Sequence, residues 1–322
     1  MSSIAEQVQR ALDAKTKPRG SLGRLEELAR RIAVIRGTVT PGRLRSTVVV
    51  AAADHGVARE GVSAYPQEVT AQMLANFNAG GSAVCVLARE FGARLRVVDA
   101  GVGRPTASIA NGPAMTPAEA RHWIDQGRLL AGELAADTDV VALGEMGIGN
   151  TTSASALVAA LLGLEPRLVC GRGTGLDDEG VARKVAVVER ALRANAVDTS
   201  DPTGTLAALG GFELAFLCGL AVGAAANRIV VLLDGFITAA AALVAARLAP
   251  ETVGAMIAAH VSTEPGHRLA LDELGLEPLL DLRLRLGEGS GAVLALPLLN
   301  ASTAILADMA TFEAAGVTDA GR

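Results

Sequence analysis

The sequence is poor in aromatic residues and has no excess of positive charge. Aromatic side chains make up 2% of its 322 residues although 50% of the residues are hydrophobic, so the core must be built from aliphatic side chains. Its 29 Lys and Arg residues are outnumbered by 34 Asp and Glu, which gives a net charge of −5. A protein that tracks nucleic acid needs a clustered positive surface. The composition therefore excludes a nucleic-acid binder, a disordered chain and a disulfide-stabilised scaffold.

Cysteine is also scarce. Cys85, Cys170 and Cys218 are odd in number, lie far apart and have apolar neighbours, which predicts small buried side chains in a reducing cytoplasm. The first ten residues lack the apolar core of a signal peptide. We therefore expect a cytoplasmic protein.

No long segment is apolar throughout. The stretches 146–164 and 289–307 carry no charge, but each contains several polar or glycine residues. A membrane-spanning segment is predominantly apolar along its whole length. We therefore expect both stretches to be buried helices of a soluble protein.

The four histidines do not form a metal-binding pattern. None has ligand spacing with cysteines or carboxylates, and Pro265 separates His260 from His267. His55 follows an apolar run and is interpreted as a buried core histidine, with a ligand contact as the alternative. No serine lies in a Gly-x-Ser-x-Gly motif. We therefore predict neither a metal site nor a cofactor.

Short apolar runs alternate with helical segments along most of the chain. The run 46–53 suits a strand that is covered on both faces. Similar runs are 95–100, 140–143, 168–169, 229–233 and, less clearly, 255–261. Helix signals lie between them, at 116–136, 177–192 and 235–248. This alternation predicts an α/β fold with a doubly wound, mainly parallel sheet of the Rossmann-like type.

Both chain ends depart from that alternation. Segments 4–14 and 22–35 have helical spacing, and an apolar helix follows Gly289. We expect a small helical domain of residues 1–44 plus 286–322, beside a large α/β substrate-binding domain of residues 45–285. In open α/β sheets ligands bind beyond the carboxyl ends of the strands. The glycine-rich turns after the strands are therefore the expected location of a site.

Two glutamates stand alone in uncharged stretches. Glu145 is the only charge in 140–164, and Glu288 is the only charge in 286–307. Each is bracketed by glycines and precedes a buried-looking helix. Burial raises the pKa of a carboxylate and suits it to accept a proton near neutral pH. The alternative is structural, because a helix N-terminus stabilises a nearby anion without any chemistry.

Two glycine-rich turns offer backbone amides of the kind that bind phosphate. The first contains Gly147, Gly149, Asn150 and Thr151. The second contains Gly173, Thr174 and Gly175, and Arg172 and Lys184 could add positive charge to it. Neither turn fits the P-loop or the dinucleotide fingerprint. Tight turns without a ligand, and a solvated helix face for the cations, remain the alternatives.

Seven segments, in order, resemble a known family. They are 17–26 (KPRGSLGRLE), 53–57 (ADHGV), 61–66 (GVSAYP), 144–152 (GEMGIGNTT), 210–213 (GGFE), 233–236 (LDGF) and 286–291 (LGEGSG). Together they resemble the nicotinate-nucleotide–dimethylbenzimidazole phosphoribosyltransferases, which act in lower-ligand assembly during cobalamin synthesis. The resemblance runs from Lys17 to Phe312.

The resemblance implies a transfer of the 5-phosphoribosyl group from nicotinate mononucleotide to a nitrogen of 5,6-dimethylbenzimidazole or a related base. The products would be α-ribazole 5′-phosphate and nicotinate. It further implies a homodimer of subunits with a parallel-sheet domain and a small helical domain, and no cofactor. Because the pyridinium leaves as a neutral ring, no metal is needed to assist its departure.

The family's site residues carry over by motif. The general base corresponds to Glu288, and Glu145 corresponds to the glutamate beside the reacting ribose. Phosphate and ribose would be held by the two glycine-rich turns, Lys184 and Gly211. By position, Tyr65, Met73 and Met146 are candidates for the walls of the base pocket, and the preferred base stays open, with a purine or a phenol among the possibilities.

Two other functions remain as hypotheses. One is a non-catalytic sensor of nicotinate mononucleotide on the same scaffold. The other is a dinucleotide-dependent oxidoreductase, against which the missing Gly-x-Gly-x-x-Gly after the first strand already argues.

Overall fold

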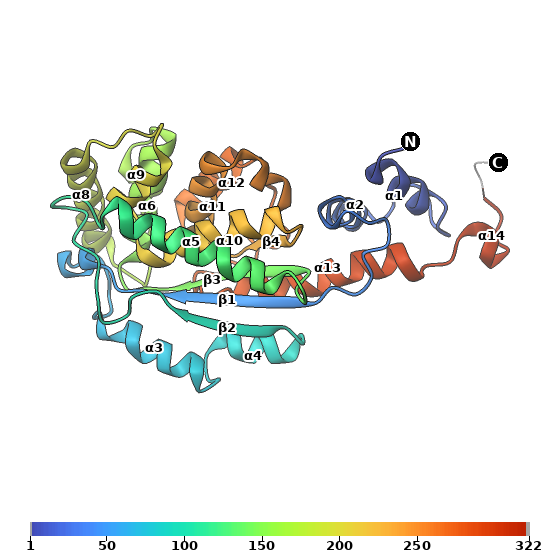
Figure 1. Ribbon diagram of the computed structural model, residues 1–322, viewed down its shortest axis with the longest axis horizontal. Helices are drawn as coiled ribbons and strands as arrows, with labels where there is room; N and C mark the ends of the chain where they lie inside the picture. Colours follow the sequence, from blue (N-terminus) through green and yellow to red (C-terminus); the bar gives the residue numbers. More distant parts are fainter. Residues whose placement is uncertain (1, 320–322) are drawn as a thin grey trace.

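In the computed structural model, which describes residues 2–319, five strands form one all-parallel sheet with helices on both faces (Figure 1). The strands are β1 (Ser46–Ala52), β2 (Arg94–Asp99), β3 (Val140–Met146), β4 (Val230–Leu233) and β5 (Met256–Ala258). Their spatial order is β2-β1-β3-β4-β5. The expected α/β fold with a parallel sheet is confirmed.

The register of the central strands decides where their loops begin. β1 pairs with β3 from Ser46 opposite Val140 to Ala52 opposite Met146, so both strands end at the same edge. After β1 the chain continues to β2 on one side of this pair, and after β3 it continues to β4 on the other side. The loops that follow β1 and β3 therefore diverge from this point. Such a divergence at the carboxyl edge of a parallel sheet is the usual position of a ligand site.

Helices cover both faces of the sheet. On one face lie α3 (Glu68–Asn78) and α4 (Ala83–Glu90), and on the other lie α5 (Pro117–Leu134), α10 (Phe212–Ala226) and α11 (Phe236–Leu248) (Figure 1). α5 approaches α10 very closely: a Cβ atom on Gly127 would lie 2.1 Å from the carbonyl oxygen of Phe216. Only glycine allows this packing of backbone against backbone.

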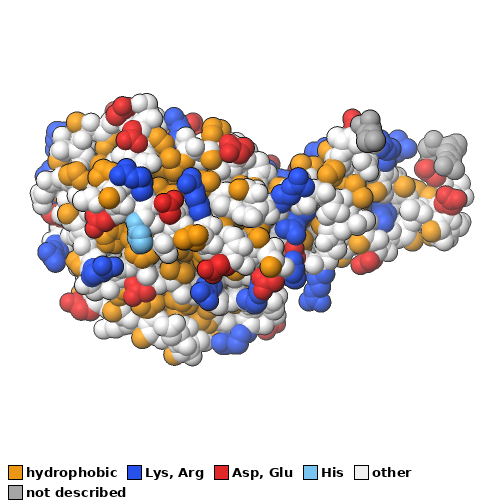
Figure 2. Space-filling model, viewed as in Figure 1, with side chains coloured by type: hydrophobic (Ala, Val, Ile, Leu, Met, Phe, Trp, Pro, Cys, Tyr) orange, Lys and Arg blue, Asp and Glu red, His pale blue; other side chains and the backbone are white. Residues whose placement is uncertain are grey.

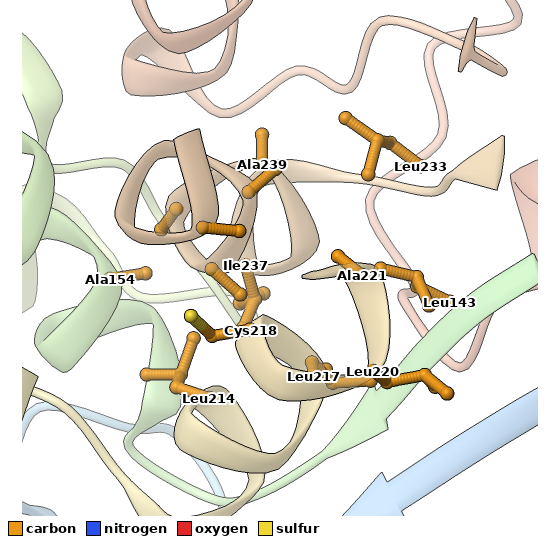
Figure 3. Packing of buried hydrophobic residues seen from close by; sticks show 14 of the residues in the cluster. Leu143, Ala154, Leu214, Leu217, Cys218, Leu220, Ala221, Leu233, Ile237 and Ala239 are labelled. Carbon is orange, nitrogen blue, oxygen red and sulfur yellow. The ribbon is translucent and has the colours of Figure 1, made fainter. Parts of the chain in front are cut away.

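The core between α10 and α11 is aliphatic, as the composition predicts. In Figure 3, Cys218 lies among such side chains, with Leu214 and Ile237 nearby. Burial raises the pKa of the Cys218 thiol to about 12. Cys85 and Cys170 are buried too, which confirms the prediction of buried cysteines.

The remaining helices connect the strands at the carboxyl edge or follow them. They are η1 (Gly56–Glu60), α6 (Asn150–Leu162), α7 (Pro166–Val169), α8 (Asp178–Asn195), α9 (Pro202–Leu209), η2 (Pro250–Ala255) and α12 (Pro265–Glu273). The capping box predicted at the start of α5 is present, because Thr116 and Glu119 accept hydrogen bonds from each other's backbone N–H.

Three of the expected strands need correction. Segment 168–169 is not a strand but the end of α7, which Pro166 opens at its first turn, where proline needs no hydrogen-bonded N–H. The strand expected at 140–143 continues to Met146 and so includes Glu145. The strand expected at 255–261 is limited to Met256–Ala258, because the chain beyond it pairs with the loop around Leu280.

The two chain ends lie together in a narrow extension (Figures 1 and 2). It contains α1 (Ile4–Asp13), α2 (Arg24–Arg36), the end of α13 (Ser290–Asp308) and α14 (Phe312–Ala315). A second, smaller hydrophobic cluster forms here from Val8, Leu12, Ala29, Ala33 and Leu306. The outermost residues of the expected small domain, Met1 and 320–322, lie outside the described residues.

Helix α13 joins the two clusters. Leu296 and Leu299 belong to the main core and Leu306 to the smaller one. It is also the one helix among residues 2–319 that is long and apolar enough to cross a membrane, and 56% of its apolar window is buried inside the protein. Core helices of soluble proteins pass the same test, so this finding is weak evidence for a membrane.

Candidate active site

Glu145 lies one residue before the end of β3, at the carboxyl edge of the sheet. Its side chain is buried, and the side-chain amide of Asn150 donates a hydrogen bond to the carboxylate. Gly149 adopts a φ of +95° between them, which turns the chain so that Asn150 can begin α6 over Glu145. The predicted turn thus brings a hydrogen-bond donor, the side-chain amide of Asn150, to the carboxylate of Glu145.

Glu288 occupies an unusual backbone conformation. Gly287, Glu288 and Gly289 have φ values of +85°, +64° and +87°, although a side chain such as that of glutamate rarely adopts this region. Such a conformation costs on the order of 1 kcal/mol or more and is typical of functional sites. The carboxylate oxygen Oε2 accepts a weak hydrogen bond, of 3.4 Å, from the N–H of Val84 at the start of α4.

Asp234, directly after β4, holds this turn in place. Its Oδ2 accepts a hydrogen bond of 3.2 Å from the N–H of Gly289, and its Oδ1 accepts one of 2.9 Å from the N–H of Ala292. Asp234 is 1% exposed. It therefore caps α13 from inside the protein and stabilises the strained backbone conformation of Glu288.

The glycines that bracket the two glutamates allow the two turns to meet. A Cβ atom on Gly144 would lie 2.4 Å from the carbonyl oxygen of Glu288. A Cβ atom on Gly287 would lie 2.2 Å from Oε1 of Glu145. The backbone at Gly144 thus packs against the backbone of Glu288, and the backbone at Gly287 packs against the carboxylate of Glu145. The structure therefore brings Glu145 and Glu288 to one place at the sheet edge.

Burial makes both glutamates weak acids. It raises the pKa of Glu145 to about 8, against the opposing hydrogen bond from Asn150 and with support from the charges of Asp234, Glu213 and Glu288. Burial also raises the pKa of Glu288, opposed by the Val84 N–H and supported by the charge of Asp234. Glu145 can therefore exchange a proton near neutral pH, and the pKa of Glu288 is shifted in the same direction.

The predicted cation Lys184 lies in a second cluster. It projects from α8, is 0% exposed, and donates to the hydroxyl of Thr151 (2.7 Å) and to the carbonyl of Gly171 (3.3 Å). Burial lowers its pKa, while Glu264 and Cys170 oppose that shift. A Cβ atom on Gly173 would lie 3.3 Å from Nζ of Lys184. The structure therefore brings both predicted glycine-rich turns onto this one cation.

Two members of the predicted phosphate set have other neighbours. Thr174 accepts a hydrogen bond of 3.0 Å from the N–H of Ala64, so its hydroxyl is directed at the 61–66 loop. The atoms nearest to Gly211 belong to His55 and Glu213, not to the Lys184 cluster. Gly175 lies near Arg285, whose guanidinium is 4.0 Å from the position of a Cβ atom there.

The three candidates for the base pocket differ in burial. Met146 ends β3 and Met73 lies on α3; both are partly buried and pack against the core. α3 also contacts the turn after β3, because Thr70 accepts a hydrogen bond of 3.1 Å from the N–H of Ile148. Tyr65 is 55% exposed. The role of these three residues in base binding stays a prediction.

Sequence reasoning missed three buried acids. Asp234 caps α13, Glu213 pairs with His55 at 2.7 Å, and Glu264 accepts a 2.8 Å hydrogen bond from the N–H of Gly173. Glu213 is the only charge in 202–227 and Asp234 the only charge in 229–246, which is the same signal that singled out Glu145. The expected burial of His55 is confirmed. Among residues 2–319, no group of three or more His, Cys, Asp or Glu residues is arranged to hold a metal ion.

The chain is similar along nearly its whole length to known proteins. A family model described as phosphoribosyltransferase matches residues 1–317. The nicotinate-nucleotide–dimethylbenzimidazole phosphoribosyltransferase of Desulforudis audaxviator is 50% identical, with 96% of this chain and 92% of the relative covered. That of Geobacter sulfurreducens is 49% identical, with 99% and 95% covered. The crystal structure of CobT from Thermus thermophilus has a TM-score of 0.94 and 47% identity, and the match covers 98% of this chain and 99% of that one.

Proposed function

The chain belongs to the family of nicotinate-nucleotide–dimethylbenzimidazole phosphoribosyltransferases, and we infer that it transfers the 5-phosphoribosyl group of nicotinate mononucleotide to 5,6-dimethylbenzimidazole in cobalamin biosynthesis. The products are α-ribazole 5′-phosphate and nicotinate. The observation that carries this conclusion for the site is the pair of buried glutamates at the carboxyl edge of the sheet, in a chain half identical to relatives with this named activity.

In the proposed mechanism, Glu288 is the general base. One benzimidazole nitrogen attacks C1′ of the ribose with its lone pair, and the bond from C1′ to the nicotinate nitrogen breaks. Its electron pair neutralises the pyridinium. The other benzimidazole nitrogen then carries an acidic N–H, and Glu288 accepts that proton. The raised pKa of Glu288 supports this role, because a base works best when its pKa lies near the working pH.

The proposed role of Glu145 is electrostatic. Positive charge develops at C1′ as the old bond stretches, and an ionised carboxylate nearby stabilises it. With a pKa of about 8, Glu145 is largely protonated in the empty site at neutral pH. A bound pyridinium cation lowers the pKa of a neighbouring carboxylate. Substrate binding would therefore ionise Glu145 at the moment its charge is needed.

Lys184 and the two turns around it are the proposed site of the 5′-phosphate. The lysine is buried beside the N-terminal turn of α6, where the helix dipole also favours an anion. Burial lowers the pKa of Lys184, and a phosphate dianion in contact with it would raise that pKa again. The hydrogen bonds that the ammonium group donates to Thr151 and Gly171 hold it in position for contact with the phosphate.

We propose a large doubly wound domain of residues 45–285 and a small helical domain from both chain ends, supported by the separate cluster around Leu12 and Leu306. A cytoplasmic homodimer is proposed with them. Analytical ultracentrifugation across protein concentrations tests the oligomeric state, and a monomer at all concentrations would contradict it.

One assay separates the enzyme from a non-catalytic sensor on the same scaffold. The protein is incubated with nicotinate mononucleotide and 5,6-dimethylbenzimidazole, and the products are identified by mass spectrometry. We expect α-ribazole 5′-phosphate and an equal amount of nicotinate, both lost in the Glu288→Gln variant. Binding of nicotinate mononucleotide without any product would favour the sensor.

A further inference from the structure

A chain of three buried side chains lies behind the turn that carries Glu145. Nε2 of His55 is 2.7 Å from Oε1 of Glu213, at the start of α10, and Nδ1 of His55 is 3.1 Å from the hydroxyl oxygen of Ser153 on α6. All three residues are 0% exposed. Their side chains already pair with one another, so we assign them no direct contact with the substrate.

The ring of His55 is held between two glycine backbones. A Cβ atom on Gly147 would lie 3.2 Å from Cδ2 of the ring, and a Cβ atom on Gly211 would lie 2.2 Å from its Cε1. Gly147 belongs to the turn between Glu145 and Asn150. The imidazole therefore packs against the backbone of this turn and supports its position.

The same ring also reaches the first turn of α6. Ser153, its partner at Nδ1, lies three residues after Asn150, which donates to the carboxylate of Glu145. His55 thus touches both segments that set the position of Glu145: the peptide of Gly147 on one side and the start of α6 on the other.

One carboxylate oxygen of Glu213 is buried without a hydrogen bond, which an apolar side chain at this position would avoid. Its Oε2 has no hydrogen-bond partner among the described residues, so the ring of His55 is its one hydrogen-bonded contact through the carboxylate. An unsatisfied buried oxygen destabilises a protein by about 1–3 kcal/mol. Departures of this kind from good packing are concentrated at functional sites.

We propose that His55, held by Glu213 and Ser153, is a positioning residue for the phosphoribosyl transfer, because its ring fixes the Gly147 turn and the start of α6 and so keeps the carboxylate of Glu145 at the ribose. This inference rests on the role proposed above for Glu145. The negative charge of Glu213 raises the pKa of Glu145, as do the charges of Asp234 and Glu288, which also face it. The hydrogen bond from Asn150 lowers that pKa.

Two variants separate the geometric part from the electrostatic part. His55→Asn removes the ring that supports the Gly147 turn. We expect kcat to fall about 10²-fold, the typical cost of a misplacement of about 1 Å in a reacting site, while KM for nicotinate mononucleotide changes little. Glu213→Gln keeps the shape of the pair and removes its charge. The acid-side limb of the pH profile of kcat/KM, which reports the free enzyme, should therefore move to lower pH.

Asp139→Asn is the matched control. Asp139 is also a buried carboxylate, but it lies just before β3, at the opposite edge of the sheet, where it pairs with Arg36 and Arg45. We expect this variant to lower thermal stability while leaving kcat and the pH profile unchanged. If His55→Asn does not fold, Ser153→Ala and Glu213→Gln, which both retain the ring, carry the test.

Double variants with Glu145→Gln distinguish the two levels of the argument. If His55 acts through Glu145, His55→Asn lowers kcat by less than about twofold in the Glu145→Gln background, because coupled residues are not additive. A normal kcat in Glu145→Gln alone would refute the proposed role of Glu145. An impaired Glu145→Gln together with a normal His55→Asn, an unmoved pH limb in Glu213→Gln, or full additivity would overturn the positioning role alone.

Discussion

The contact between Gly287 and Glu145 gives the sharpest test of the site. A Cβ atom added by Gly287→Ala would lie 2.2 Å from Oε1 of Glu145, whereas ordinary contact begins at 3.4 Å, so the carboxylate must retreat by about 1.2 Å. Because the far end of a flexible side chain moves cheaply, the collision should cost little stability. A misplacement of about 1 Å in a reacting site costs on the order of 10²-fold in rate. We therefore expect kcat to fall about 10²-fold.

Gly275→Ala is the matched control for this experiment. Gly275 has a φ of +64° and Gly287 one of +85°, so both positions strain an alanine, but no atom lies within 4 Å of a Cβ on Gly275. The backbone strain costs about 1–2 kcal/mol in each case, a fall in Tm of a few degrees. Kinetics with both substrates and thermal melting should show equal melting shifts and a loss of activity in Gly287→Ala only. A Gly287→Ala variant with wild-type kcat would refute the assigned geometry.

Three further outcomes are expected. Glu288→Gln should lower kcat by about 10²- to 10⁴-fold, as loss of a general base does, with nicotinate mononucleotide binding by calorimetry preserved. Because the folded pKa of Glu145, about 8, lies above the unfolded value near 4.5, its contribution to stability is full below pH 4.5 and is lost as the pH rises towards 8. The free energy of unfolding should fall by at most about 1.4 kcal/mol per pH unit across that window, and Glu145→Gln should abolish that part of the slope; an unchanged slope would contradict the burial of a titrating acid. Lys184→Met should raise KM for nicotinate mononucleotide by about 10- to 100-fold, the worth of a charged hydrogen bond, and an unaltered KM would remove Lys184 from the phosphate site. Tm should fall as well, because the hydroxyl of Thr151 and the carbonyl of Gly171 lose their donor.

Local patterns predicted the elements well where the signal lay within a few residues. The capping box at Thr116 and Glu119 marks the start of α5, and the β-branched run of β1 marks a strand buried along its whole length. The prediction failed at Leu168 and Val169, where two residues are too few to show a period and Pro166 opens a helix instead.

The candidate site was predictable only in part. Glu145 and Glu288 stand out because each is the sole charge in an apolar stretch, and Lys184 stands out less clearly. Glu213 and Asp234 carry the same signal, as the only charges in 202–227 and 229–246, and Glu264 carries a weaker one. What the sequence does not show is their partners, which are distant along the chain. The N–H of Gly289 that binds Asp234, for example, lies 55 residues away.

The sequence by itself determined the aliphatic core, the alternation of strands and helices, the glycine turns and the two isolated acids. Those properties depend on residue type and short spacing, which a linear chain displays directly. Tertiary structure alone decided that the turn at Gly287 rests on the carboxylate of Glu145, that Asp234 stabilises the strained turn at Glu288, and that His55 lies beneath Gly147. Each of these contacts joins loops from different strands, and only the parallel register of the sheet brings those loops to one edge.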